Sequence, residues 1–316
     1  MSRAMYRSNF LSSNQKDRIA YYVFQADPLT QPPKAVIQIS HGMCEYFLRY
    51  SDFASFLVDH GYAVCGNDHL GHGDSVPSDK YLGYFAPEKG WNYLVEDVHR
   101  LTVLMKGRFP NVPIILLGHS MGSFIARLYL DRYSQELAGC MIVGTNGGNP
   151  FTAVGISLAK QIKAVKGEFY RSDLLQKMMN AGFNSKYAEH YSNYDWLSRD
   201  KQVVDQFAAD EKCGFTFTTS GFLDLFTMIQ MISRSSWGEN IRKDLPLYLF
   251  AGAADPVGGH GKGVEKVSRH LKQLGIRDVE CKLYPEARHE VLNELNKQEV
   301  YQDCLDWLNR HGFGEN

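Results

Sequence analysis

The 316-residue sequence has no long hydrophobic run, no closely spaced cysteine pair and no excess of charge of either sign. No apolar stretch approaches the roughly 20 residues that cross a bilayer, and none stands near the first residues, so we expect neither a membrane span nor a secretory signal. The 34 Lys and Arg against 35 Asp and Glu give a net charge of −1, so we expect no nucleic acid as a partner.

The six cysteines are scattered along the chain without any CxxC pair. Scattered cysteines without a signal segment are typical of reduced thiols, so we expect a cytoplasmic protein. What the chain does contain is 44% hydrophobic residues, enough for a large core. This composition is typical of a globular enzyme.

Short apolar runs alternate with stretches of helical periodicity. Between the runs, apolar residues such as Phe53, Phe56 and Leu57 recur at spacings of three and four, which predicts helices. The alternation predicts an α/β fold with a mostly parallel, doubly wound sheet. A further segment, 18–25, is expected to add an antiparallel edge strand. The apolar runs that predict buried strands are 35–39, 62–65, 114–117, 140–143, 247–250 and 279–284.

The alternation breaks between 149 and 238, where the sequence is helix-like and rich in aromatic residues and methionine. We interpret 149–238 as a helical cap inserted after the sixth strand, between a first part (1–148) and a second part (239–316) of the core. Most of its aromatic residues should form its own core, and a minority should line a pocket, since clefts between domains are favoured ligand sites.

Residues 118–122 read Gly-His-Ser-Met-Gly and match the pattern G-x-S-x-G. They lie between a predicted strand and a predicted helix, the setting that a nucleophile elbow requires. Gly118 and Gly122 suit a turn whose neighbours come too close for a Cβ atom. The pattern predicts Ser120 as a nucleophile.

A serine nucleophile needs a base and an acid that orients the base. In this strand–turn–helix architecture the acid and then the base follow the serine in the chain. His289 follows the run 279–284 and Asp255 follows the run 247–250, whereas the exit of the run 140–143 has no carboxylate. We therefore predict His289 as the base and Asp255 as the acid. His41 precedes the serine and is expected to be structural.

Two backbone N–H groups are needed to stabilise an oxyanion. One is predicted to be that of Met121, directly after the nucleophile, and the other that of Met43, where Gly42 permits the turn. Glu45 and Arg49 are expected to support this loop. We expect no metal and no cofactor. The cluster of Asp68, His69 and His72 has a glycine-rich spacing that fits a loop held by side-chain to backbone hydrogen bonds rather than a metal site.

Five segments of the sequence, in their order along the chain, resemble segments of the monoacylglycerol lipase and lysophospholipase-like group of the α/β-hydrolase superfamily, whose members are also described as S33-type hydrolases. The resemblance covers nearly the whole chain and implies an α/β-hydrolase fold, a triad of Ser120, Asp255 and His289, a cap over the site, and hydrolysis of acyl esters without metal or cofactor. Cys44 and His260 depart from the pattern and could alter the pocket. The segments are 41–50, 67–75, 118–122, the cap around 196–215, and 255–257 with 289–294.

We therefore expect a serine hydrolase of lipid-type carboxylic esters that forms an acyl-enzyme on Ser120, with a small-molecule acyl ester as substrate and transient contact of the cap with a membrane surface. An esterase for small aromatic esters, a non-catalytic binding protein of this fold and an aminopeptidase remain alternatives, and the oligomeric state stays open. An aminopeptidase needs carboxylates that hold the substrate amine. The cap offers Glu168, Asp173, Asp195, Asp205, Asp210, Glu211 and Asp224.

Overall fold

The computed structural model describes residues 2–27, 31–149, 152–185, 187 and 191–314. Eight strands form one sheet in the order β1-β2-β4-β3-β5-β6-β7-β8, in which β1, β2 and β4 pair antiparallel and the other neighbouring strands pair parallel. This arrangement confirms the predicted α/β class and the mostly parallel sheet. The strands are β1 Arg3–Leu11, β2 Arg18–Ala26, β3 Val36–Ser40, β4 Ala63–Asn67, β5 Ile114–His119, β6 Gly139–Val143, β7 Leu247–Gly252 and β8 Val279–Tyr284.

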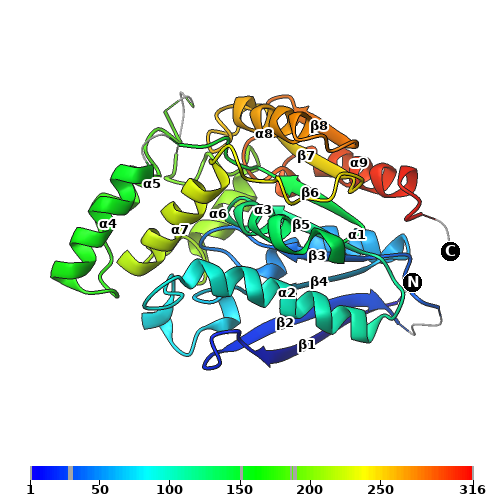
Figure 1. The fold of residues 1–316 in the computed structure, drawn as a ribbon, viewed down its shortest axis with the longest axis horizontal. Coiled ribbons are helices and arrows are strands. Elements are labelled where there is room, and N and C mark those ends of the chain that lie inside the picture. Colours follow the sequence, from blue (N-terminus) through cyan, green and yellow to red (C-terminus); the bar gives the residue numbers. More distant parts are fainter. Residues whose placement is uncertain (1, 28–30, 150–151, 186, 188–190, 315–316) are drawn as a thin grey trace.

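Helices cover both faces of the sheet (Figure 1). One hydrophobic cluster joins α2, α3 and α8 to one face, and a second joins α1 and α9 to the other. Every residue of β3, β4, β5, β6 and β7 is buried, as expected for parallel strands covered on both sides. These helices are α1 Ser51–Asp59, α2 Gly90–Arg108, α3 Met121–Tyr133, α8 Lys262–Gln273 and α9 Lys297–Arg310.

The prediction that 18–25 forms the edge of the sheet was wrong. The segment is antiparallel as expected, but β1 pairs with all of it and is the outermost strand. Most residues of β1 are exposed, and it carries Arg3, Arg7, Ser8 and Asn9. A strand with one solvated face and no apolar run gives no hydrophobic signal in the sequence.

Four helices lie between β6 and β7 in the sequence and, in Figure 1, beyond one end of the strands, away from both termini. The last of them, α7, contributes Phe222, Leu225 and Met228 to the cluster that also contains α2 and α3. α7 therefore ties the inserted segment, residues 149–238, to the main core. The four helices are α4 Thr152–Lys166, α5 Asp173–Met179, α6 Lys201–Ala209 and α7 Thr219–Ile232.

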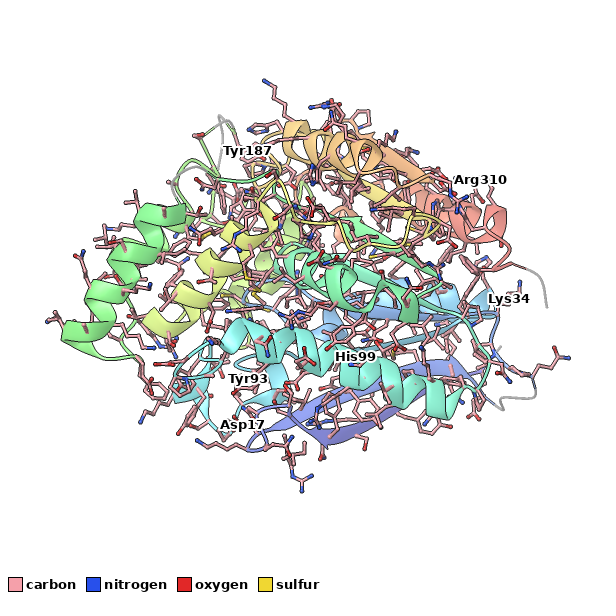
Figure 2. All side chains as sticks on the ribbon, viewed as in Figure 1. Asp17, Lys34, Tyr93, His99, Tyr187 and Arg310 are labelled. Atoms are coloured by element: carbon pink, nitrogen blue, oxygen red, sulfur yellow. The ribbon has the colours of Figure 1, made fainter. Side chains whose placement is uncertain are left out.

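Between α5 and α6 the chain returns toward the core. Figure 2 shows Tyr187 near the top of the molecule beside α8, and its hydroxyl donates a hydrogen bond to the carbonyl oxygen of Ala254 at 2.6 Å. The described residues include no helix whose length and hydrophobicity would let it cross a bilayer. Phe151 and His190, which belong to the predicted cap 149–238, lie outside the described residues.

Candidate active site

Ser120 occupies the sharp turn between β5 and α3. Its backbone has φ 54° and ψ −119°, a strained conformation for a residue with a side chain. A Cβ on Gly118 would lie 2.4 Å from the Gly122 carbonyl oxygen, and a Cβ on Gly122 would lie 2.0 Å from the Ser40 carbonyl oxygen. Both positions therefore require glycine, and the turn presents Ser120 at the carboxyl end of β5.

Asp255 and His289 come together from loops 34 residues apart in the chain. The His289 Nδ1 lies 3.0 Å from the Asp255 Oδ1, and both side chains are buried. Because an ionised carboxylate can only accept, the Nδ1 carries the proton and the Nε2 presents its lone pair. The Asp255 Oδ1 also accepts from the Val257 N–H at 2.8 Å, which fixes the carboxylate in its turn.

The Nε2 of His289 is buried and has no hydrogen-bond partner among the described residues. His289 and Ser120 line one pocket between the sheet and the inserted segment. The structure thus brings the three predicted residues to one place, with the ring nitrogen that a general base needs left unpaired.

The loop after β3 lies beside the elbow. A Cβ on Gly42 would lie 3.2 Å from the Ser120 Cβ, so the two turns are in close contact. Met43 and Met121 line the same pocket. Neither of their backbone N–H groups donates to an acceptor among the described residues. Both donors are therefore free to bind an oxygen of a ligand.

A buried carboxylate holds the Gly42 loop. The Glu45 Oε1 accepts from the Gly42 N–H at 2.6 Å and from the Tyr50 hydroxyl at 2.7 Å, and the Oε2 accepts from Arg49 at 2.6 Å. The same guanidinium makes two hydrogen bonds of 2.7 Å to Glu290, which directly follows His289. One arginine thus connects the Gly42 loop to the His289 loop.

His119, the residue before the nucleophile, belongs to this network, a role that sequence reasoning missed. Its Nδ1 lies 2.9 Å from the Tyr50 hydroxyl and 3.3 Å from the Glu45 Oε1. Burial raises the pKa of Glu45, but the hydrogen bond to His119 and the charge of Arg49 outweigh it, and the pKa is well below its usual range. The Glu45 carboxylate therefore keeps its charge. In the sequence, the only signal for this role of His119 was its place inside the elbow motif.

The cluster of Asp68, His69 and His72 forms hydrogen bonds with both backbone and side chains, and the His69 Nε2 lies 3.0 Å from the Ser40 Oγ. The His41 Nε2 accepts from the His69 N–H at 3.0 Å, and the His72 Nε2 accepts from the Cys44 N–H at 3.3 Å. Asp68 accepts from the amides of Phe47 and Asp74 at 2.9 and 2.8 Å. These bonds connect the loop after β4 to the loop that contains Gly42.

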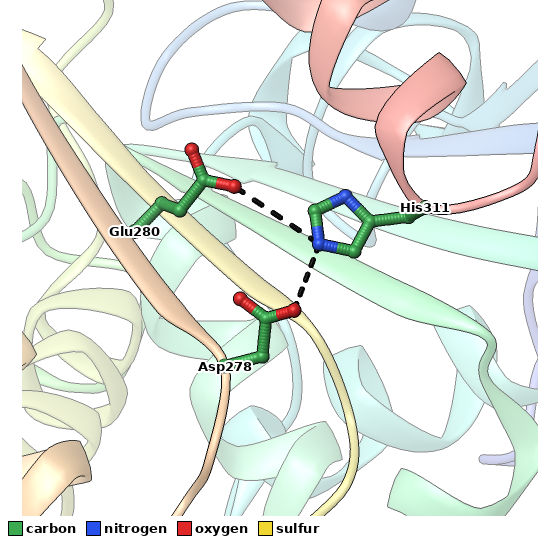
Figure 3. A group of neighbouring side chains, drawn as sticks. All are labelled: Asp278, Glu280 and His311. Carbon is green, nitrogen blue, oxygen red and sulfur yellow. Dashed lines mark hydrogen bonds and ion pairs between the residues drawn. The ribbon is translucent and has the colours of Figure 1, made fainter.

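One group among the described residues could share a cation, and it lies elsewhere. The His311 Nε2 lies 2.9 Å from the Asp278 Oδ2 and 4.0 Å from the Glu280 Oε1 (Figure 3). Asp278 directly precedes β8, so this group is at the amino end of the strand, whereas Ser120 and Asp255 follow the carboxyl ends of theirs. It takes no part in the pocket.

The pocket wall is mainly apolar and comes from both the core and the inserted segment. Trp196 lies over His289, with ring centroids 5.1 Å apart. The described carboxylates in the wall are Glu45 and Glu290, both paired with Arg49. Apolar side chains in the wall include Met43, Met121, Phe124, Met179, Phe183, Tyr194, Trp196, Leu197, Phe207, Phe215, Leu225 and Val257.

The chain matches a protein family and several known proteins along most of its length. A family model described as serine aminopeptidase S33 matches residues 31–296. The chain is 27% identical over 299 residues to a monoacylglycerol lipase of Mycolicibacterium smegmatis, covering 93% of this chain and 94% of that protein. It is 25% identical over 284 residues to the human monoglyceride lipase, covering 89% and 84% respectively.

A solved structure is also similar along the whole chain. The thermostable carboxyl esterase from Bacillus coagulans, in complex with glycerol, superimposes with a TM-score of 0.91 at 27% identity. The match covers 98% of this chain and 99% of that one.

Proposed function

Because the chain belongs to the serine aminopeptidase S33 family of α/β-hydrolases, we propose that Ser120, His289 and Asp255 form its catalytic triad. The protein is a carboxylic ester hydrolase. The observation that carries the triad is the buried Asp255–His289 hydrogen bond of 3.0 Å, which leaves the Nε2 lone pair unpaired in the pocket that Ser120 also lines.

The reaction proceeds through an acyl-enzyme. The His289 Nε2 takes the hydroxyl proton of Ser120 as the Oγ attacks the ester carbon, and the oxygen of the tetrahedral intermediate accepts from the N–H groups of Met43 and Met121. The imidazolium, held by Asp255, gives its proton to the leaving alcohol. Water then loses a proton to His289 and attacks the acyl carbon. His289 returns that proton to the Ser120 Oγ as the bond between the Oγ and the acyl carbon breaks, which releases the acid and free Ser120.

We propose monoacylglycerols as the substrate class. The pocket wall of aromatic, leucine and methionine side chains suits an acyl chain, and methionine adapts to chains of irregular shape. The lipases to which the chain is similar carry that substrate in their names. Burial of the acyl chain supplies binding energy in proportion to its apolar area.

An aminopeptidase activity is less favoured, because none of the seven carboxylates that the predicted cap was expected to offer is among the residues of the pocket wall. Asp195 instead accepts from the Tyr191 and Ser192 amides, and Asp210 accepts from the Tyr46 hydroxyl. Glu45 and Glu290 are both paired with Arg49. A substrate ammonium therefore finds no unpaired carboxylate in the wall.

We further propose that 149–238 acts as a cap that contacts lipid surfaces. Val154 and Val165 on α4 are 60% and 80% exposed, and Leu174 on α5 is 56% exposed. Exposed apolar side chains on the segment that also supplies part of the pocket wall are suited to contact the aggregated substrate. The six cysteines are free thiols, which supports a cytoplasmic location.

The function is tested with Ser120→Ala, which should fold normally and lose at least about 10³-fold in hydrolysis of monoacylglycerols and p-nitrophenyl esters. A fluorophosphonate should label the wild type once, at Ser120, and leave the variant unlabelled. Exposed Ser185 provides the control Ser185→Ala, which should keep full activity. A preference for aminoacyl naphthylamides over monoacylglycerols would contradict the proposed substrate class.

A further inference from the structure

Arg127 on α3 is a buried cation with no carboxylate partner among the described residues. Its side chain is enclosed, with the guanidinium 4.1 Å from the Trp237 ring centroid. It donates to the carbonyl oxygens of Asn146 at 2.9 Å and Ile232 at 2.7 Å, while its Nε has no partner. Burial lowers its pKa to about 9. A buried guanidinium is ordinarily neutralised by an anion, so this charge is uncompensated.

Arg127 forms one wall of a surface pocket that is separate from the Ser120 pocket. The other basic residues in its wall are Arg234, Lys266, Arg269 and His270. None of the described residues that line it is acidic. On the outside, Glu265 lies 3.8 Å from Arg269, and within the described part of the chain no carboxylate forms an ion pair with Arg127, Arg234 or Lys266.

Polar groups converge inside this pocket at Gly148. A Cβ at this position would lie 3.0 Å from the Ser233 Oγ and 3.8 Å from the Lys266 Nζ. Gly148 is therefore in close contact with Ser233, whose hydroxyl already donates to the Ile229 carbonyl oxygen at 2.5 Å, and it lies near the Lys266 ammonium. The donors that the pocket wall offers to an oxyanion are the Lys266 ammonium, the Arg234 guanidinium and the Ser235 hydroxyl.

We propose that the pocket bounded by Arg127, Lys266 and Arg234 is a binding site for a phosphoryl group. A phosphate dianion provides several acceptor oxygens for ammonium, hydroxyl and guanidinium donors, and it balances the charge of the enclosed Arg127. The group could belong to a soluble phosphomonoester or to a phospholipid headgroup, which share this chemistry. Binding of a phosphoryl group at this site does not require the proposed catalytic triad.

The same pocket is joined to the loop that contains Asp255. Arg127 holds the carbonyl of Asn146, and the Asn146 side chain donates to the Val257 carbonyl oxygen at 3.1 Å. A Cβ on Gly147 would lie 2.5 Å from the Gly263 Cα, so the pocket wall packs directly on the first turn of α8. An anion that orders residues 144–149 therefore also restrains the turn of residues 255–263.

The test uses the full chain with inorganic phosphate as the probe. Calorimetry should detect binding, and phosphate should raise Tm more than chloride at equal ionic strength. The exposed pair Lys266→Gln with Arg234→Gln should fold and lose at least about tenfold in phosphate affinity, because each lost charged contact weakens binding by this order. The matched control is Lys272→Gln, an exposed lysine of the same helix outside the pocket, which should bind as the wild type does.

Two further arms identify the source of the phosphoryl group. Glycerol 3-phosphate that binds at least as well as inorganic phosphate assigns a soluble ligand. If instead vesicles containing phosphatidic acid bind more tightly than either soluble probe, and the double variant loses that binding, the ligand is a headgroup. The site is refuted if phosphate stabilises no more than chloride does, or if the double variant binds every probe as the wild type does.

Hydrogen exchange tests the connection to Asp255. Phosphate should slow amide exchange in peptides that cover 144–149 and 255–263 in the wild type and in Lys272→Gln, but not in the double variant. Binding without slower exchange in 255–263 would refute the connection while leaving the site itself intact. Because these measurements need no turnover, they can be repeated in Ser120→Ala, where they stay valid even if the proposed triad is wrong.

Discussion

Trp196 contacts His289 through both its ring and its backbone. The indole and imidazole centroids are 5.1 Å apart, and the Trp196 carbonyl oxygen accepts a hydrogen bond from the His289 N–H at 3.3 Å. The next residue repeats the pattern, since Leu197 accepts from the Glu290 N–H at 2.7 Å. The inserted segment therefore holds the loop of the proposed base directly and also contributes to the pocket wall.

Removal of the indole should weaken turnover of long-chain substrates most. In Trp196→Ala the imidazole loses its packing partner and the pocket wall loses apolar area next to Phe183, whose ring centroid lies 4.7 Å from the indole. We expect kcat/KM for monoacylglycerols to fall about tenfold or more, and that for acetyl esters to fall less. Steady-state kinetics on esters of increasing chain length measure this difference.

The control for this prediction is Tyr170→Ala, an exposed aromatic of the same inserted segment that is outside the pocket wall. Its kinetics should match the wild type at every chain length. An equal loss for short and long esters in Trp196→Ala would contradict a role of the indole in acyl-chain binding.

Asp255→Asn should reduce kcat strongly while leaving the fold intact. The amide that replaces the carboxylate can donate to the Nδ1 and so favours the tautomer with a proton on the Nε2, which cannot act as a base. The expected loss in kcat is on the order of 10³- to 10⁴-fold. The variant's Tm and kcat measured on the same preparation separate chemistry from stability.

His260 in the same loop provides the comparison. Its Nδ1 lies 3.1 Å from the Ala254 carbonyl oxygen and its φ is 57°, a conformation that asparagine tolerates. His260→Asn should therefore fold and keep its activity within a few-fold. An active Asp255→Asn together with an inactive His260→Asn would overturn the assignment of the acid.

Gly122→Ala should destabilise the protein and abolish activity. The added Cβ would lie 2.0 Å from the Ser40 carbonyl oxygen, so β3 and the elbow would have to separate. We expect a loss of several kcal/mol in the free energy of unfolding, measured from the urea midpoint.

Gly107→Ala on α2 is the matched substitution, because a Cβ there meets no atom within 4 Å. It should leave activity unchanged and stabilise the helix by up to about 1 kcal/mol, the difference in helix propensity between the two residues. If both variants were equally stable, the close contact at the elbow would not be the reason for glycine.

The stability of the protein should depend on Asp224. Burial raises the pKa of this carboxyl on α7 to about 7, against which the amides of Gly90 and Trp91 act in part. Between about pH 4 and pH 7 the unfolded chain has lost this proton and the folded chain still holds it. The free energy of unfolding should therefore fall as pH rises through this window, by at most about 1.4 kcal/mol per pH unit from this group.

Asp224→Asn removes the titration and keeps an acceptor oxygen for those amides. Its Tm relative to the wild type should rise from pH 5 to about pH 7 and stay level from there to pH 8. Asp205→Asn, at an exposed position on α6, should follow the wild type at every pH. A constant difference in Tm between Asp224→Asn and the wild type across this range would contradict the prediction that the folded protein holds a proton on Asp224.

Much of the fold was predictable because its signals are local. Parallel strands buried on both faces are apolar runs, and helices between them show their period, so the order of elements from β2 onward could be derived from neighbouring residues. The elbow motif is also local, since Gly118 avoids a clash with Gly122, whereas Gly122 avoids a clash with Ser40 of β3, which the fold brings beside it. The strand β1 escaped prediction because its polar face is solvated and its pairing with β2 depends on backbone hydrogen bonds rather than on an apolar pattern.

Only the tertiary structure decided which distant side chains meet. Chain order offered Asp255 and His289 as candidates, but their 3.0 Å contact exists because β7 and β8 are neighbours in the sheet. The role of His119 and the basic pocket around Arg127 could not be derived from sequence at all. Arg127 and its partner Ile232 are more than a hundred residues apart in the sequence, and burial alone lowers the pKa of Arg127. Burial also lowers the pKa of His119, but the hydrogen bond to Glu45 and the charge of that carboxylate outweigh burial and raise it, because the fold brings these two groups together.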